Sequence, residues 1–212
     1  VLCEPKHRDR VVEQLGDREV TVFVAAPDVL RGVVGFRFHR GVVASADRLS
    51  LPSVAALVTT VAAAPTGRLL VAEGLNDPEN LGLIARTARA FGVDGVVIDP
   101  RCIDPYYRRT IRVSMGEILR LPTARSVDWP SDLDVIHAAG FETWAMTPQG
   151  DVDLAACAPP SHLAIVVGAE GPGLDRATIE RATRRVRIPI DPAVDSINVG
   201  HASAIALSAT TR

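Results

Sequence analysis

Two spacings of apolar residues alternate along most of the chain. From residue 68 on, short continuous apolar runs are followed by stretches in which apolar residues recur every three or four positions. Short runs are typical of buried strands, and the longer spacing is typical of helices that pack on a sheet by one face. The pattern predicts strands at 68–73, 95–98, 142–146, 163–167 and 185–190, and helices at 77–92, 110–117, 133–139, 175–182 and 199–207. This alternation indicates an α/β fold with a mostly parallel, doubly wound sheet.

The beginning of the chain has a pattern of its own. It predicts strands at 1–3, 20–25 and 41–44 and helices at 7–15 and 27–34. An amphipathic helix follows at 53–63 and indicates a connector, because Pro65 and Gly67 stop it. We therefore expect three parts: a small α/β domain at 1–45, a linker helix within 46–66, and the main domain at 67–212. Since Val1 looks like the end of a strand, we expect the first domain to be incomplete.

The helix that begins at Asp77 is the most clearly marked element. Asp77 can cap its first turn, Pro78 suits the first helical position, and Gly92 can adopt the left-handed conformation that ends a helix. The apolar residues of this helix share one face: Leu81, Ile84, Ala85, Ala88 and Phe91. Arg86 projects from nearly the opposite face, so we expect it to be exposed.

A glycine-dense loop follows the strand predicted at 163–167. Residues 166–174 read Val-Val-Gly-Ala-Glu-Gly-Pro-Gly-Leu, and glycine allows a ligand to approach the backbone closely. Ligands of open α/β sheets bind beyond the carboxyl ends of strands. The loop lacks the Gly-Lys-Ser/Thr ending of a phosphate loop. It is also not in the first βα unit, where a dinucleotide-binding fingerprint would lie. Glu170 within it favours a ligand with hydroxyls or positive charge, although an ordinary turn is the alternative.

A second candidate segment lies at 188–198. It runs from a strand end through a polar turn to Ser196-Ile197-Asn198, where a helix of small residues begins. Backbone N–H groups at the start of a helix lack intrahelical partners and can bind a polar ligand. A helix that Ser196 or Asn198 simply caps is the alternative interpretation.

The charge of the chain limits how it could bind nucleic acid. The net charge is −2, so nucleic-acid binding would have to come from local arginine clusters. One cluster surrounds Tyr106 and Tyr107, whose rings could stack on bases: Arg101, Arg108, Arg109, Arg112, Arg120 and Arg125. The other comprises Arg176, Arg181, Arg184, Arg185 and Arg187. Both could equally be solvated surfaces.

No membrane span or signal peptide is evident in the sequence. Cys3, Cys102 and Cys157 are odd in number, far apart and without metal-ligand spacing. Reduced, structural thiols are therefore expected. Together these features predict a cytoplasmic protein that binds neither a membrane nor a metal.

The candidate segments together resemble the SpoU/TrmH family of RNA ribose 2′-O-methyltransferases, within the SPOUT class. The family motifs are similar, in order, to residues 75–92, 112–122, 168–173 and 188–199. The resemblance covers residues 69–208. The first 45 residues, including His39-Arg40-Gly41, look like the end of the L30e-like substrate-binding domain that precedes the catalytic domain in many members.

The resemblance implies a C-terminal trefoil knot and a homodimer whose active sites are completed at the subunit interface. It also implies S-adenosyl-L-methionine as the cofactor, held mainly through the backbone at five positions: Gly168, Gly171, Ile188, Ile190 and Ile197. The residues that match the family's polar catalytic positions are Asn80, Arg86, Glu170, Ser196 and Asn198. No metal is implied.

The implied reaction passes a methyl group to a ribose 2′-hydroxyl of RNA. The family's usual assignment gives the position of Arg86 the role of general base, but a charged guanidinium has no lone pair. A clamp on the RNA phosphate is the alternative. An L30e-like domain favours ribosomal RNA over transfer RNA. A non-catalytic RNA-binding module on the same fold stays open, as does a doubly wound enzyme for another nucleotide, although an early Gly-x-Gly-x-x-Gly is missing.

Overall fold

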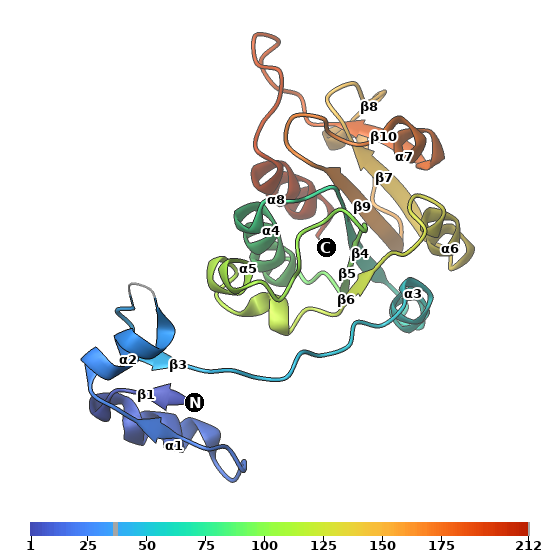
Figure 1. Cartoon of the computed structure of the whole chain (residues 1–212). Helices are drawn as coiled ribbons and strands as arrows, with labels where there is room; N and C mark the ends of the chain where they lie inside the picture. The colour runs from blue at the N-terminus through green and yellow to red at the C-terminus, as the bar shows by residue number, and fades with distance from the viewer. Residues whose placement is uncertain (36–37, 212) are drawn as a thin grey trace. The chain divides into compact units, whose positions relative to one another are not determined.

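The chain folds into two compact units. The computed structural model describes residues 1–35 and 38–211, so residues 36 and 37 of the predicted first domain lie outside it. The units are Val1–Leu49 and Ser50–Arg212. Figure 1 shows the first unit in blue and the second from cyan to red.

The first unit contains a small three-stranded sheet. Its elements are β1 (Leu2–Cys3), a 3₁₀ turn η1 (Pro5–His7), α1 (Arg8–Leu15), β2 (Phe23–Val24), α2 (Pro27–Val34) and β3 (Val42–Val43). The strand order is β2-β1-β3, with β1 parallel to β2 and antiparallel to β3. The predicted order of strands and helices is confirmed, although each strand is only two residues long.

The second unit is built on a seven-stranded sheet. The strands are β4 (Gly67–Glu73), β5 (Gly95–Ile98), β6 (Thr123–Arg125), β7 (Glu142–Met146), β8 (Val152–Asp153), β9 (His162–Gly168) and β10 (Arg184–Arg187). Their order is β6-β5-β4-β9-β7-β10-β8, and each ladder is parallel. The predicted α/β fold with a doubly wound sheet is confirmed. The analysis of the sequence missed β6 and β8, which are too short to carry a periodic pattern.

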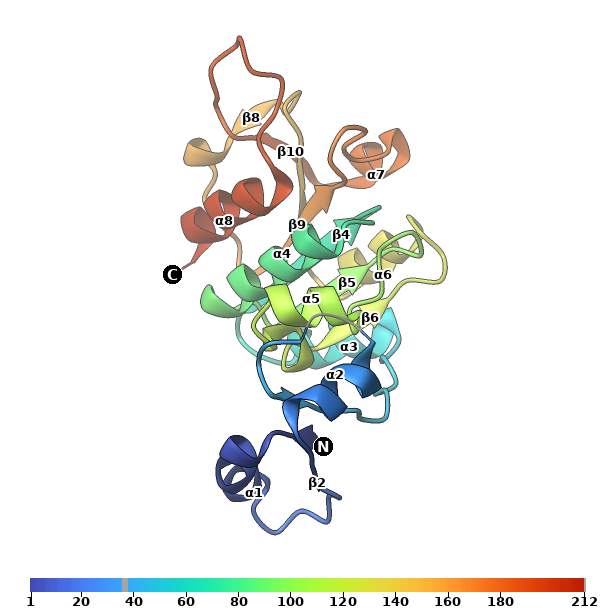
Figure 2. The same cartoon turned by 60° about the vertical axis from the view of Figure 1, so that its left-hand side comes forward.

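Helices cover both faces of this sheet, as Figure 1 shows. One face carries α4 (Pro78–Ala90), α5 (Arg108–Val113) and α8 (Val199–Thr210), and the other carries α3 (Val54–Ala62), α6 (Asp132–Ala138) and α7 (Arg176–Arg181). Figure 2 shows α8, α4 and α5 following one another across their face. Alternate residues of β4 point to the two cores: Leu70 packs with the α4 side, and Leu69 with the α3 side. Alternation of this kind is the two-residue period of a strand.

Helix α3 lies within the stretch 46–66 that the sequence predicted as a connector. In the structure it belongs to the second unit. Val58 is fully buried there, and Leu57 packs closely on Gly95 of β5, where a Cβ atom would come within 2.9 Å of the leucine side chain.

The helix predicted at 110–117 is shorter than expected. It ends as α5 at Val113, and a separate 3₁₀ turn η2 (Glu117–Leu119) follows. Met115 and Gly116 separate the two with positive φ angles of 56° and 85°. A right-handed helix cannot continue through residues in that conformation.

Strand β10 lies between β7 and β8, which are consecutive in the chain. The connection 147–151 therefore crosses β10: Thr147 N donates to Val186 O at 3.0 Å, and Asp151 N donates to Arg185 O at 3.0 Å. At Gly150 an added Cβ would lie 2.6 Å from the nitrogen of Arg187. The crossing is thus so close that Gly150 cannot carry a side chain without a backbone shift.

The second arginine cluster holds elements of this unit together. Each of its members forms an ion pair: Arg176 with Glu180, Arg181 with Asp134, Arg184 with Glu142, Arg185 with Asp151, and Arg187 with Asp153. The last three join β10 to β7 and to the β8 segment. This cluster therefore gives no support to the RNA-binding interpretation.

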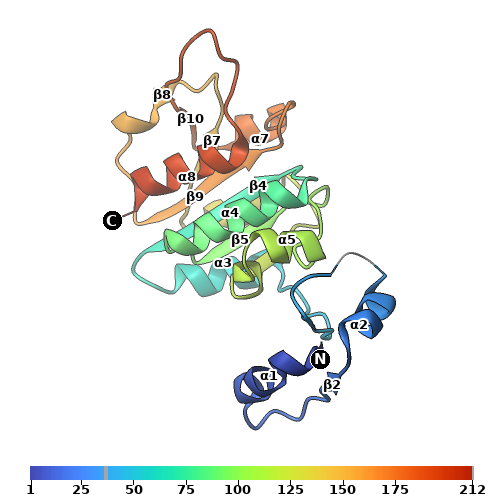
Figure 3. The same cartoon turned by 90° about the vertical axis from the view of Figure 1, so that its left-hand side faces the viewer.

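The predicted strand 185–190 is corrected at its end. Strand β10 stops at Arg187, and Ile188 and Ile190 leave the sheet to line a pocket. Figure 3 shows the segment between β10 and α8 as a long loop at one end of the second unit.

Candidate cofactor pocket and polar network

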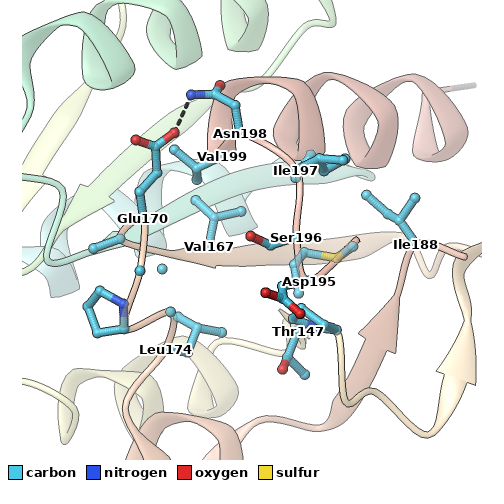
Figure 4. A pocket seen from close by; sticks show the side chains of 18 of the residues that line it. Thr147, Val167, Glu170, Leu174, Ile188, Asp195, Ser196, Ile197, Asn198 and Val199 are labelled. Atoms are coloured by element: carbon cyan, nitrogen blue, oxygen red, sulfur yellow. Dashed lines mark hydrogen bonds between the residues drawn. The ribbon is translucent and has the colours of Figure 1, made fainter. Parts of the chain in front are cut away.

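A pocket of about 510 Å³ lies beyond the carboxyl ends of β7, β9 and β10. Its walls come mainly from three loops, at 146–149, 167–174 and 188–199 (Figure 4). This is the edge at which open parallel sheets bind ligands. Eight predicted site residues line it: Gly168, Glu170, Gly171, Ile188, Ile190, Ser196, Ile197 and Asn198.

The glycine-dense loop folds tightly back on its own strand. Ala169 forms a β-bridge with Gly173, and a Cβ atom on Gly168 would lie 2.3 Å from the carbonyl carbon of Gly173. Gly171 and Gly173 have positive φ angles of 86° and 71°, which favour glycine. The glycines therefore shape the pocket wall, because they allow the backbone at 168–169 and the backbone at 173–174 to pack in direct contact.

We expect Gly168→Ala to weaken cofactor binding and to destabilise the second unit. The new methyl group must push the backbone of Gly173 and Leu174 away, at a cost of about 1–3 kcal/mol in the free energy of unfolding. If about half of that displacement energy opposes binding, affinity falls by roughly twofold to tenfold. Urea unfolding and calorimetric titration measure the two effects.

Gly32→Ala is the matched control for this variant, since a Cβ atom there meets nothing within 4 Å. It should leave binding unchanged. Wild-type affinity in Gly168→Ala would show that the loop can move without affecting the pocket.

Three segments meet in a polar network at one side of the pocket. Asn198 caps α8 through its Oδ1, which accepts from Gly200 N at 2.9 Å. Its Nδ2 donates to Asn80 Oδ1 at 3.1 Å and to the carboxylate of Glu170. Figure 4 shows the contact between Glu170 and Asn198. One asparagine therefore joins the starts of α4 and α8 to the glycine-dense loop.

Close packing of α8 on α4 makes this network possible. A Cβ atom on Gly200 would lie 2.5 Å from the side chain of Leu83, so glycine brings the start of α8 close to α4. Asn80, at the start of α4, is 7% exposed. Its side chain is thus held under Asn198, although it does not itself line the pocket.

Arg86 is not brought into the pocket. It is exposed on α4, as its helical position predicted. It makes no hydrogen bond or ion pair with another described residue. Of the predicted polar site residues, the structure therefore joins Asn80, Glu170 and Asn198 directly, places Ser196 nearby in the pocket wall, and leaves Arg86 apart.

Residues 146–149 form a wall of the pocket that was not predicted from the sequence. Thr147 Oγ1 donates to Gln149 Oε1 at 2.9 Å in this turn, and both residues line the pocket. The turn carries no recognisable motif. Its position directly after the strand predicted at 142–146 was the available signal, because carboxyl ends of parallel strands share one edge.

The pocket is acidic and otherwise uncharged. Among its described lining residues, Glu170 and Asp195 are ionisable and none is Lys, Arg or His. Much of the remaining wall is apolar, including Val167, Leu174 and Ile188. Such a lining suits a ligand that combines positive charge with an apolar group.

A partly buried ion cluster supports the loops beside the pocket. Arg101 Nη2 lies 2.8 Å from Glu73 and 2.8 Å from Asp175, and its Nε lies 2.8 Å from Asp99. Asp175 N also donates to Glu73 Oε2 at 3.3 Å. Because Asp175 directly follows the glycine-dense loop, Arg101 ties that loop to the ends of β4 and β5.

The pKa values of two carboxyl groups in this cluster are shifted in opposite directions. Burial raises the pKa of Glu73, and the neighbouring Asp175 raises it further. Burial alone would also raise the pKa of Asp99, but hydrogen bonds from the Gly74 backbone, Arg101 and Cys102 lower it overall. Arg101 therefore neutralises two side chains that are 1% and 0% exposed.

The first arginine cluster is also largely engaged within the chain. Arg101, Arg109 and Arg120 pair with carboxylates. Arg125 donates to four backbone carbonyls, those of Asp99, Pro100, Cys102 and Ile103. Tyr107 is half exposed. These arginines therefore stabilise the chain around residues 99–109, and their charges are already partly neutralised by groups of the same chain.

Within residues 1–35 and 38–211, no group of three His, Cys, Asp or Glu side chains is placed to hold a metal ion. No described helix is both long and apolar enough to cross a bilayer. The three cysteines are free, and burial raises the pKa of the Cys102 thiol to about 12.

Comparison with solved structures shows which fold this is. An AdoMet-bound rRNA methyltransferase from Sinorhizobium meliloti matches with a TM-score of 0.80 at 22% identity, covering 98% of this chain and 78% of that one. The SpoU methyltransferase AviRb from Streptomyces viridochromogenes matches with a TM-score of 0.81 at 19% identity, covering 98% and 79%. Both share the fold of this chain.

Sequence relatives agree with the structural matches. An uncharacterised tRNA/rRNA methyltransferase of Mycobacterium tuberculosis is 45% identical over 192 residues, 89% of this chain and 65% of that protein. The 23S rRNA (guanosine(2553)-2′-O)-methyltransferase RlmP of Bacillus subtilis is 30% identical over 65% of this chain and 55% of its own length. The chain thus spans less than two thirds of these relatives. The model of the SpoU rRNA Methylase family matches residues 67–208, and the chain belongs to that family.

Proposed function

We propose that this protein is an S-adenosylmethionine-dependent RNA methyltransferase that modifies a ribose 2′-hydroxyl, with ribosomal RNA as the favoured substrate. The observation that carries the proposal is the pocket in which the glycine-dense loop and the 188–198 segment meet. The name of the Bacillus subtilis relative supports the 2′-O position and ribosomal RNA.

The pocket residues fit S-adenosylmethionine. Gly168 and Gly171 leave backbone groups accessible, while Ile188, Ile190 and Ile197 offer apolar contacts for a flat base. The acidic lining matches a cationic ligand. When bound, the cofactor would supply an activated methyl group.

Arg86 is proposed to hold the RNA rather than to remove a proton. A guanidinium stays protonated in proteins and has no free lone pair, but it binds phosphate through two parallel hydrogen bonds. Such a clamp would fix the ribose hydroxyl for in-line transfer, and alignment of this kind can supply up to roughly 7–11 kcal/mol of the barrier reduction.

The remaining polar residues are proposed to position this hydroxyl and the loop. Glu170 holds the glycine-dense loop to α8 through Asn198. Asn80 fixes the Asn198 side chain from below. Ser196 has no hydrogen bond to another described residue, so its hydroxyl can contact the substrate.

We propose a homodimer in which Arg86 holds the RNA beside the cofactor pocket of a second copy. Arg86 lies outside the pocket of its own chain. Its helix α4 shares one face of the sheet with α5 and α8 (Figure 3). Exposed apolar residues lie on α4, on α8 and in the segment that follows α5: Leu83, Ile205, Met115 and Leu119. An exposed apolar surface of this kind favours association, and light scattering would give the mass in solution.

The C-terminal trefoil knot, the L30e-like nature of the first unit and a cytoplasmic location are part of the same proposal. The position of β10 between β7 and β8, under the 147–151 connection, supports the knot. The small mixed sheet with α1 and α2 supports an L30e-like, RNA-binding first domain. Three free cysteines suit a reducing compartment.

The decisive test has two steps. Calorimetry should show one S-adenosylmethionine bound per chain, with weaker binding in Gly168→Ala. The enzyme is then given methyl-labelled cofactor with either ribosomal or transfer RNA that lacks ribose methylation. Label that remains in alkali-resistant dinucleotides marks a 2′-O-methyl group.

Each outcome decides a part of the proposal. Label in transfer RNA alone would overturn the ribosomal substrate, and label at a base would overturn the 2′-O position. RNA binding without any cofactor binding, even with RNA present, would favour a non-catalytic RNA-binding module.

A further inference from the structure

Asp195 is a charged residue that lines the pocket and, within the described part of the chain, has no hydrogen bond or ion pair that would give it a structural role. It lines the pocket at the end of the polar turn before Ser196, and Figure 4 shows its side chain next to Thr147. It forms no hydrogen bond or ion pair with another described residue. Its carboxylate is thus exposed to whatever occupies the pocket.

The second carboxylate of the pocket is in a different situation. Glu170 accepts a hydrogen bond from Asn198 and is thereby held at the rim. No lysine, arginine or histidine is found among the described lining residues to balance the two charges. The pocket therefore carries an uncompensated negative potential, to which Asp195 contributes the freer group.

The two cofactor forms differ in charge. S-adenosylmethionine carries a sulfonium and an ammonium group against one carboxylate, so it is a net cation. S-adenosylhomocysteine has lost the sulfonium charge with its methyl group and is net neutral. A negative pocket attracts the first more than the second.

We infer that Asp195 makes the pocket discriminate between the methyl donor and its demethylated product by charge. This inference rests on the proposed function. The carboxylate favours entry of the cationic donor, and its attraction disappears when the methyl group has been transferred. Release of the neutral product is thereby favoured without any change in the shape of the pocket.

Titration of Asp195→Asn with both ligands tests the inference. Loss of one unit charge near the surface should weaken S-adenosylmethionine binding by roughly threefold to tenfold. Binding of S-adenosylhomocysteine should change less than about twofold, since it lacks the net charge on which the field acts. Sinefungin, in which a carbon bearing an amino group replaces the methylated sulfur, keeps the positive charge, and its binding should weaken like that of the donor.

Asp191→Asn is the matched control. Asp191 lies in the same loop but does not line the pocket, and its Oδ1 accepts from Ala193 N at 2.9 Å. Asparagine can accept the same hydrogen bond, so the loop is kept while one charge is removed. The affinity ratio of the two ligands should stay at its wild-type value. Raising the salt concentration should lower that ratio in the wild type and less in Asp195→Asn.

Two results would overturn the inference. Equal weakening of both ligands in Asp195→Asn would show that the residue shapes the loop. Unchanged affinities for both ligands would show that its charge is not felt in the pocket. A wild-type protein that binds neither ligand, with or without RNA, would instead refute the proposed function and the inference with it.

Discussion

Replacing Arg86 with lysine should reduce methyl transfer on the order of a hundredfold while leaving S-adenosylmethionine affinity at its wild-type value. Lysine keeps the positive charge but loses the planar fork that binds phosphate through two hydrogen bonds. Arg86 does not line the pocket, so the cofactor should not be affected. Single-turnover methylation and calorimetry separate the two quantities.

Arg89→Lys is the control for position and charge. Arg89 is on the same helix and partly exposed, with Glu117 at 3.4 Å as its partner. It should methylate RNA at the wild-type rate. Near-normal turnover in Arg86→Lys would refute the phosphate clamp, and loss of cofactor binding would show that Arg86 acts within the pocket.

Replacing Arg101 with methionine should lower the free energy of unfolding by about 2 kcal/mol at neutral pH. Removing one partner of a fully buried ion pair typically costs about 3–5 kcal/mol, and we reduce this value because the Arg101 side chain is 54% exposed. The loss follows from leaving Glu73 and Asp99 buried without their cation. Cofactor affinity should fall as well, because the glycine-dense loop loses its tie through Asp175.

The cost of Arg101→Met should depend on pH. A carboxyl group whose pKa is raised on folding contributes stability at low pH and loses that contribution as the pH rises through its folded pKa. Glu73 is such a group, and without Arg101 it can avoid an unpaired charge only by staying protonated. Asp99, whose pKa is lowered, is ionised across the range. Urea unfolding should therefore show a larger loss at about pH 8 than at about pH 5.

Arg181→Met supplies the comparison, since its ion pair with Asp134 is exposed on both sides and such pairs contribute little. It should produce a much smaller loss with no such pH trend. An equal loss at both pH values in Arg101→Met would show that Glu73 does not need the arginine as its counter-ion.

Long elements with clear caps could be predicted from the sequence. The helix at Asp77 is the best case: Asp77 Oδ1 accepts from Glu79 N at 2.8 Å, and Gly92 has a φ of 69°. Local chemistry specifies both ends of this helix. Strands β6 and β8 could not be found, because strands of three and two residues have no period and are stabilised by their neighbours.

Partners of charged residues are the second kind of information that the sequence lacked. The arginines at 176–187 suggested a basic surface because they lie close together in the sequence, whereas most of their carboxylate partners do not. Their carboxylate partners lie as much as 47 residues away, as in the pair of Arg181 with Asp134. Strand order, which no local pattern encodes, brings these groups together.

The candidate site shows the same division. Its two glycine- and asparagine-bearing segments were identified from the glycine content of one and the helix start of the other, and the family resemblance assigned both to one site. The structure brings them to one pocket. The wall at Thr147 and Gln149 was missed since only the parallel order of β7, β10 and β9 places it there. The sequence predicted that Arg86 is exposed on its helix. It did not predict that Arg86 lies outside the pocket that the other site residues form.

The order of strands at this edge has a consequence for how the chain is made. Strand β8 is the edge strand, hydrogen-bonded to β10, yet it leaves the ribosome some thirty residues before its partner. Until Arg184–Arg187 have been synthesised, β8 has no ladder to join, and the 147–151 connection has nothing to cross. A chain truncated just before Arg184 would therefore lose two strands of the sheet rather than one, together with the pocket wall at 188–199.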